Sequence, residues 1–341
     1  MLNFFETQHP IIQAPMAGVQ DHKLTAAVSN AGGLGSLPCA MLGPEALRSE
    51  LEALKAATDR PFNLNFFAHT PPAPDEDSER RWRQALAPYY QEFGIDPDAI
   101  SSGPGRMPFN EEAAAVVEEF RPAVVSFHFG LPEPALVERV KKAGAKILST
   151  ATTVEEALWL EQHGADAVIA QGLEAGGHRG IFLTRDMTTQ MGTFALLPQI
   201  VAAVKVPVIA AGGIADARGV KAALDLGASA AQVGTAFLLC PEATTKPVHR
   251  DALKSPQARH TVITNLFSGG PARGIVNRVM RELGPVSPEA PAFPLATSSI
   301  APLRAAAEAT GSGDFSPLWC GQNASGCREK PAAEVLEGLV R

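Results

Sequence analysis

The stretch ADAVIAQGLEAGGHRG, residues 165–180, joins a run of apolar residues to a loop that contains four glycines. The apolar run is continuous rather than alternating, which is typical of a parallel strand that is covered by helices on both faces. The loop combines flexible backbone with three chemically useful side chains, Glu174, His178 and Arg179. A phosphate-binding loop, a catalytic loop and a flexible connection are all compatible with this pattern.

Seven other segments read as strands of the same kind, and amphipathic stretches separate them. Pro44 stands at a first helical position, where its missing N–H costs nothing. Thr152 or Thr153 is placed to cap a second helix, and Asp216 and Gly227 bracket a third. The eight predicted strands are IIQAPM, GGLGSL, FNLNFF, AVVSFHFG, AKILSTA, DAVIAQG, VPVIAAGG and AAQVGTAF.

Eight strand–helix units over roughly 240 residues predict an α/β fold of the (β/α)₈ TIM-barrel type. A doubly wound sheet is the rival fold, but its G-x-G-x-x-G fingerprint after the first strand is missing. Two stretches do not fit the barrel, and we expect them to form a smaller, mostly helical cap over its C-terminal mouth. The predicted parts are barrel segments 1–68 and 116–240, cap segments 69–115 and 241–320, and a C-terminal segment 321–341 that packs on the barrel.

Composition excludes several classes of function. The net charge is −7 and no basic run is interleaved with aromatics, so neither nucleic acid nor an anionic membrane is expected as a partner. The chain shows no secretory signal and no apolar span, which favours the cytoplasm. The four cysteines form no C-x-x-C pair and are expected to be buried free thiols, and no histidine spacing suits a metal site.

In a TIM barrel the carboxyl ends of the strands form the active site. Amides and small residues gather at these ends, as a flat ligand with a phosphate tail would require. The glycine turns after the seventh and eighth strands are the expected phosphate site, although tight turns alone would also explain them. The residues at the strand ends are Pro15, Met16, Ala17, Asn63, Asn65, His128, Gln171, Gly212, Gly213, Gln232, Gly234 and Thr235.

Two histidines follow predicted strands and are candidates for chemistry. His178 has small neighbours and could act as a general base. A histidine that is only hydrogen-bonded within the loop, or an anion ligand beside Arg179, fits equally well. His128 is either a substrate ligand or a core histidine bonded to the backbone. Glu174 is expected to be an exposed loop residue.

The motifs IIQAPMAGV, VSNAGGLGSL, FNLNFF, VVSFHFG, QGLEAGGHRG, VIAAGGI, AQVGTAFL and PLWCGQ resemble those of class I nitronate monooxygenases. AGGHRG is the most specific of these motifs. The resemblance covers about residues 11–325 and implies non-covalent FMN at the barrel mouth. It implies that FMN is contacted by Pro15, Met16, Ala17, Asn65, Gln171, Gly176, Gly212, Gly213, Gln232, Val233, Gly234 and Thr235.

The family reaction is oxidative denitrification of an alkyl nitronate by O₂, through an anionic flavin semiquinone, to an aldehyde or ketone and nitrite. The resemblance makes His178 the catalytic residue, with His128 and His178 as substrate ligands and propionate 3-nitronate as the substrate of a detoxification role. The expected partners are the nitronate and O₂, with the protein a monomer or homodimer. Relatives line the pocket with several tyrosines, whereas this chain has only Tyr89 and Tyr90. The alternatives are a related NAD(P)H-dependent enoyl-acyl-carrier-protein or quinone reductase, and a barrel that binds flavin without catalysis.

Overall fold

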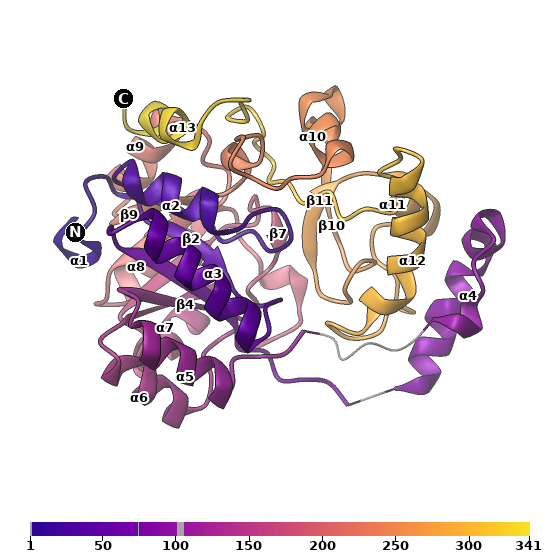
Figure 1. Ribbon diagram of the computed structural model, residues 1–341, viewed down its shortest axis with the longest axis horizontal. Helices are drawn as coiled ribbons and strands as arrows, with labels where there is room; N and C mark the ends of the chain where they lie inside the picture. The colour runs from indigo at the N-terminus through magenta and orange to yellow at the C-terminus, as the bar shows by residue number, and fades with distance from the viewer. Residues whose placement is uncertain (1, 74, 101–105) are drawn as a thin grey trace.

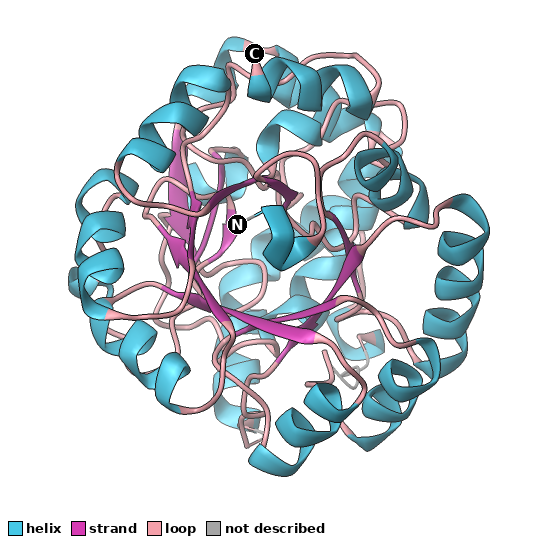
Figure 2. Cartoon of the chain, turned by 90° about the vertical axis from the view of Figure 1, so that its left-hand side faces the viewer, coloured by secondary structure: helices cyan, strands magenta, loops and turns pink. Residues whose placement is uncertain are grey.

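Eight parallel strands form one sheet that closes into a barrel, as Figure 2 shows in a view onto the barrel. The computed structural model describes residues 2–73, 75–100 and 106–341. The strand order is β1-β9-β8-β6-β5-β4-β3-β2, and a parallel bridge from Ile12 to Leu34 joins the two edges. The predicted barrel and all eight predicted strands are confirmed. The strands are β1 Ile11–Gln13, β2 Gly35–Pro38, β3 Phe62–Phe67, β4 Val124–His128, β5 Lys146–Ala151, β6 Ala167–Gln171, β8 Val208–Ala211 and β9 Ala230–Val233.

Helices surround the barrel, and their ends follow the capping signals in the sequence. Pro44 begins α3, the Thr153 side chain accepts from the Glu156 N–H to cap α7, and Asp216 accepts from the Gly219 N–H to cap α9. The C-terminal helix α13 packs against α2 and α9. The outer helices are α2 His22–Asn30, α3 Pro44–Ala57, α5 Glu111–Phe120, α6 Pro134–Lys142, α7 Val154–Gln162, α8 Thr193–Ala203, α9 Ala217–Asp225 and α13 Ala332–Val340, while the short α1 spans Leu2–Phe5.

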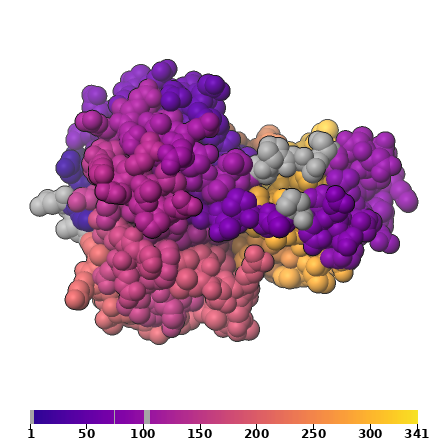
Figure 3. All heavy atoms as spheres, turned by 90° about the horizontal axis from the view of Figure 1, so that it is seen from below, coloured from indigo at the N-terminus to yellow at the C-terminus, as the bar shows by residue number. Residues whose placement is uncertain are grey.

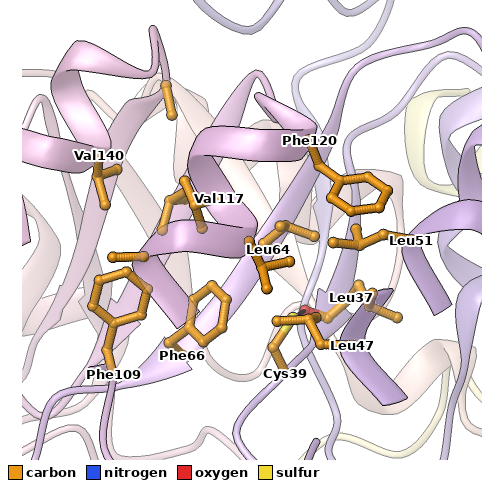
Figure 4. Close-up of a cluster of buried hydrophobic side chains, with 14 of the residues drawn as sticks. Leu37, Cys39, Leu47, Leu51, Leu64, Phe66, Phe109, Val117, Phe120 and Val140 are labelled. Atoms are coloured by element: carbon orange, nitrogen blue, oxygen red, sulfur yellow. Dashed lines mark hydrogen bonds between the residues drawn. The ribbon is translucent and has the colours of Figure 1, made fainter. Parts of the chain in front are cut away.

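The apolar runs of the strands are buried between the barrel and these helices. One such cluster fills the space between β2 and β3 and the helices α3, α5 and α6 (Figure 4). Leu64 and Phe66 of β3 meet Leu51 of α3 and Val117 of α5 there. Strands that are covered on both faces need no polar alternation, which explains their continuous apolar sequence.

The two predicted insertions meet in a second body beside the barrel (Figures 1 and 3). Trp82 and Tyr90 of α4 pack against Ile300 and Leu303 of α12 in a separate apolar core. The Tyr90 hydroxyl donates to the Ser299 carbonyl at 2.7 Å. The helices of this part are α4 Glu76–Phe93, α10 Pro247–Lys254, α11 Arg278–Leu283 and α12 Ala296–Ala309.

The second body also contains a three-stranded antiparallel sheet, which the expectation of a mostly helical cap did not include. Strands β10 Thr261–Thr264 and β11 Ala272–Ile275 are only four residues long, too short for a strand period to stand out. The third strand, β7 Gly177–His178, belongs to the glycine loop after β6 and pairs with β11. This pairing ties the loop of the barrel to the cap.

Among the described residues, no helix is both long and apolar enough to cross a membrane.

Candidate functional site

A cavity opens at the carboxyl ends of the barrel strands, below the cap. Ten residues predicted for the cofactor from the strand ends line it, together with Gly176, His128 and His178. Val233 does not line it, because its side chain is buried in the core and its carbonyl accepts from the Ala14 N–H. The ten lining residues are Pro15, Met16, Ala17, Asn65, Gln171, Gly212, Gly213, Gln232, Gly234 and Thr235.

Arg179 holds the glycine loop in shape from beneath. Its side chain is fully buried and donates to the carbonyls of Gln171 at 2.7 Å and Gly172 at 2.6 Å, and to Gln190 Oε1 at 3.0 Å. Burial lowers the pKa of this guanidinium to about 10, which leaves it charged at neutral pH. All of its bonds go to loop and neighbouring residues, so Arg179 supports the site and is not offered to an anion.

Two more residues fasten the loop. The Gln171 side chain donates to the His178 carbonyl at 3.0 Å and accepts from the Gly180 N–H at 2.8 Å, so it spans the loop from its first residue. Glu174 accepts from the Thr193 N–H and hydroxyl at the start of α8. The expectation that Glu174 is an exposed loop carboxylate is therefore wrong, because it satisfies a free helix N-terminus.

Gly176 lets the C-terminal segment pack onto this loop. A Cβ atom at Gly176 would stand 2.6 Å from the Cys320 carbonyl carbon and the Gly321 nitrogen, closer than a side chain tolerates. The Gln322 N–H donates to the Glu174 carbonyl at 2.9 Å beside this contact. Gly177, in contrast, has φ +72° and open space where a Cβ would lie. The first glycine thus serves packing, and the second leaves clearance in the cavity.

Aromatic side chains surround His178, and one of its ring nitrogens is hydrogen-bonded within the protein. Its Nε2 lies 2.8 Å from the Ser268 hydroxyl, and its ring centre lies 5.2 Å from that of Phe293 and 5.5 Å from that of Trp319. Its Nδ1 has no hydrogen-bond partner within the described ranges. Burial, and then the nearby charge of Arg106, lower the pKa of His178 well below its usual value, so the ring is neutral at neutral pH.

His128 uses both ring nitrogens within the protein. Its Nε2 donates to the His178 carbonyl at 3.1 Å, which leaves Nδ1 to accept from the Thr150 hydroxyl at 3.1 Å. Burial lowers the pKa of His128 to about 4. The ring therefore reaches the cavity wall as a neutral support for the His178 backbone, and the predicted direct contact of its nitrogens with an anion does not match this geometry.

The opposite end of the cavity is lined by backbone. The main-chain N–H groups of Gly213, Gly234 and Thr235 have no protein acceptor within the described parts of the chain, and Gly213 has φ +73°. The Asp216 carboxylate accepts from the Gly219 N–H and so occupies the start of α9. An anion at this end would meet the two turns themselves.

Several residues of the site escaped the sequence analysis. Ser268 and Phe293 lie in the segment after the barrel, and nothing local marks them as functional, while Trp319 belongs to the motif PLWCGQ but was given no role. Arg106 lines the cavity from the first insertion, and His249 lines it from α10, where its Nε2 donates to the Trp319 carbonyl. The rule that active-site residues follow the carboxyl ends of barrel strands does not apply to an insertion. Only the tertiary structure brings these side chains to the cavity. Tyr89 and Tyr90 are buried in the cap core instead.

The whole chain, residues 1–341, matches the family model described as nitronate monooxygenase. A protein of Pseudomonas aeruginosa named nitronate monooxygenase is 46% identical over 98% of this chain and 95% of its own length. A protein of the same name from Paraburkholderia phytofirmans is 44% identical, with 97% of this chain and 91% of that protein covered.

Solved structures give a consistent result. A nitroalkane oxidase from Streptomyces ansochromogenes superposes with a TM-score of 0.88 at 40% identity, covering 98% of this chain and 95% of that one. FabK from Thermotoga maritima has a TM-score of 0.73 at 29% identity, covering 99% of this chain and 94% of that one. The barrel and its cap are therefore similar to both proteins, and more similar to the nitroalkane oxidase.

Proposed function

Because the chain belongs to the nitronate monooxygenase family, we propose that it binds FMN and oxidises alkyl nitronates with O₂, releasing nitrite and an aldehyde or ketone. The observation that carries this proposal is the placement of His178. Its unpaired Nδ1 and its aromatic neighbours stand at one end of a cavity whose other end is lined by free backbone N–H groups.

The cavity wall suits a flavin. The buried Gln232 Oε1 has no partner in the described part of the chain, and an N–H or hydroxyl of the flavin would satisfy it. We propose that Pro15, Met16 and Ala17 lie beside the ring and that Asn65, Gln171 and Gly176 line the ring and ribityl chain. Gly213, Gly234 and Thr235 would hold the phosphate end. Bound FMN would supply the redox chemistry that side chains cannot perform.

Gly213→Ala is expected to lower FMN retention. Gly213 has φ +73°, so a side chain there costs about 1–2 kcal/mol and pushes the turn away from the geometry that aims its N–H at the phosphate. Gly144→Ala is the matched control, because Gly144 has φ +92° with open space for a Cβ and lies outside the cavity lining. Flavin content per protein after gel filtration measures the effect. Equal loss in both variants would mean that Gly213 only affects folding.

The substrate end is suited to a small organic anion with an apolar tail. Phe67 and Trp319 line the cavity and Phe293 stands against His178, so the surroundings of the reacting carbon would be largely apolar. We propose that His178 Nδ1 is directed at the nitronate oxygens. Because Ser268 bonds to Nε2, the Ser268 hydroxyl determines which ring nitrogen carries the proton. A hydroxyl that donates to Nε2 leaves Nδ1–H as a donor for the nitronate.

Ser268→Ala is expected to lower kcat/KM for ethyl nitronate about 5- to 10-fold, the equivalent of one neutral hydrogen bond. Flavin content should stay unchanged, because Ser268 is absent from the cavity lining. Ser49→Ala, on the exposed face of α3, is the control. Unaltered kinetics in the Ser268 variant would remove its proposed role in orienting His178.

The proposed function is tested by a direct assay. The purified protein is expected to be yellow, to release FMN on heating, and to consume O₂ and form nitrite with ethyl nitronate or propionate 3-nitronate without NAD(P)H. Propionate 3-nitronate is the physiological substrate that we propose. Absence of nitrite from flavin-loaded protein would overturn the oxidative function.

The reductase alternative is weaker. The matching family model and the relative that is 46% identical are both named nitronate monooxygenase, and neither name refers to a reductase. We expect NADH and NADPH to leave the flavin absorbance near 450 nm unchanged over the time of nitronate turnover. Rapid anaerobic bleaching by either nucleotide would favour the reductase.

A further inference from the structure

We propose that Arg106 is the anion-binding residue of this cavity, and that its guanidinium receives the negative charge of the substrate beside His178. The inference rests on the proposed nitronate oxidation and identifies the side chain that selects for a charged substrate. Arg106 lies in the first insertion and lines the same cavity as His178.

The first observation is the position of the guanidinium. Its central carbon lies 5.6 Å from the centre of the Phe293 ring, and the His178 ring centre lies 5.2 Å from the same point. The Phe109 N–H donates to the Phe67 carbonyl at 2.8 Å, which fastens this segment to the end of β3. Arg106 and His178 thus adjoin one aromatic side chain at the substrate end of the cavity.

The second observation is a charge without a counter-charge. The Arg106 Nη1 is buried without a hydrogen-bond partner, and no carboxylate within the described ranges forms an ion pair with this residue. The residues outside those ranges, 1, 74 and 101–105, carry no carboxylate in their sequence. Burial, and then the neighbouring Arg304, lower the pKa of Arg106, while Arg304 is paired with Glu308. A buried cation of this kind is costly unless a ligand brings the missing negative charge.

His69 adds a second group of the same kind. It packs 5.0 Å from Phe293, ring centre to ring centre, and its buried ring nitrogens form no well-aligned hydrogen bond among the described residues apart from a weak contact with the Arg106 backbone. Burial lowers its pKa, so it is a neutral ring with an N–H to donate. Arg106 and His178 therefore offer donors to the cavity, His69 packs beside them on Phe293, and the described structure places no carboxylate among the three. This arrangement favours an anionic nitronate over its neutral nitroalkane.

Arg106→Met tests the inference. Loss of a charge-assisted hydrogen bond is expected to raise KM for ethyl nitronate roughly 10- to 100-fold, with a smaller change in kcat. Arg106→Lys keeps the positive charge but lacks the planar, two-pronged guanidinium, and it should recover part of the affinity.

Nitrate, an unreactive planar oxyanion, is expected to perturb the flavin spectrum of the wild-type enzyme on saturation and to bind Arg106→Met at least about 10-fold more weakly. Arg218→Met, which removes a 94% exposed side chain, is the control.

Stability separates a binding role from a structural one. Removal of an unpaired buried charge should leave Tm unchanged or raise it, whereas loss of a structural contact lowers it. An unchanged KM and nitrate affinity in Arg106→Met, or a large fall in Tm, would overturn the inference. A wild-type enzyme that oxidises no nitronate would instead refute the proposed function, and nitrate binding would still report on Arg106.

Discussion

His178→Ala is expected to lower nitronate turnover by about 100-fold or more while the protein keeps its flavin. The reason is geometric. Nδ1 of His178 has no partner among the described residues, Nε2 is held by Ser268, and Phe293 and Trp319 confine the ring to one orientation. Steady-state nitrite formation and flavin content measure the two parts of the prediction.

Two further variants separate the possible roles of His178. His178→Asn keeps a hydrogen-bond donor but cannot accept a proton at neutral pH. If His178 holds the anion, this variant retains more activity with ethyl nitronate than His178→Ala does. If His178 removes a proton, both variants lose activity with neutral nitroethane alike. His163→Ala changes an exposed histidine on Trp159 and should behave as wild type. Wild-type turnover by His178→Ala would dismiss the assigned role.

Arg179→Met is expected to have the largest effect on stability, a loss of about 3–5 kcal/mol in the free energy of unfolding. The variant leaves the Gln171 and Gly172 carbonyls and the Gln190 amide oxygen buried without their charged donor. Since these carbonyls belong to the loop that carries His178, activity should fall as well. Urea unfolding monitored by circular dichroism gives the free energy.

Arg185→Met is the control for this variant, because Arg185 is exposed in the same connection. Its effect should stay within about 0.5 kcal/mol. Arg179→Lys should be nearly as unstable as Arg179→Met, since a single ammonium cannot reproduce the planar fork that reaches three acceptors. Wild-type stability of Arg179→Met would show that the loop holds its shape without the guanidinium.

The strands of the barrel could be predicted because each signal is local. The run AVIAQ of β6 is buried along its whole length, and its apolar residues predict this burial without information from the rest of the chain. The caps at Thr153 and Asp216 are equally local, since each side chain bonds a backbone N–H three residues ahead. The strands β10 and β11 were missed because four residues show too little pattern, and their sheet is completed by a strand from the barrel loop.

The same distinction holds for the candidate site. Residues at strand ends, such as Gln171 and Gln232, follow from barrel topology alone. Glu174 was misread because its acceptor role depends on the start of α8, nineteen residues away in the chain. Arg106, Ser268 and Phe293 come from insertions whose path over the barrel no local pattern specifies.

The sequence by itself determined a closed parallel barrel, a ring of amides and glycines at one mouth, and a histidine in the loop after β6. These features depend on the pattern of buried side chains along each element, on the residues that cap the helices, and on the rule that the carboxyl ends of parallel strands meet at the same edge. Only the tertiary structure decided how QGLEAGGHRG is used. Arg179 is buried beneath it, His128 is committed to its backbone, and the cap supplies Ser268 and Arg106 around His178. Charge and tautomer at a site depend on which distant groups are buried together, and that is a property of packing.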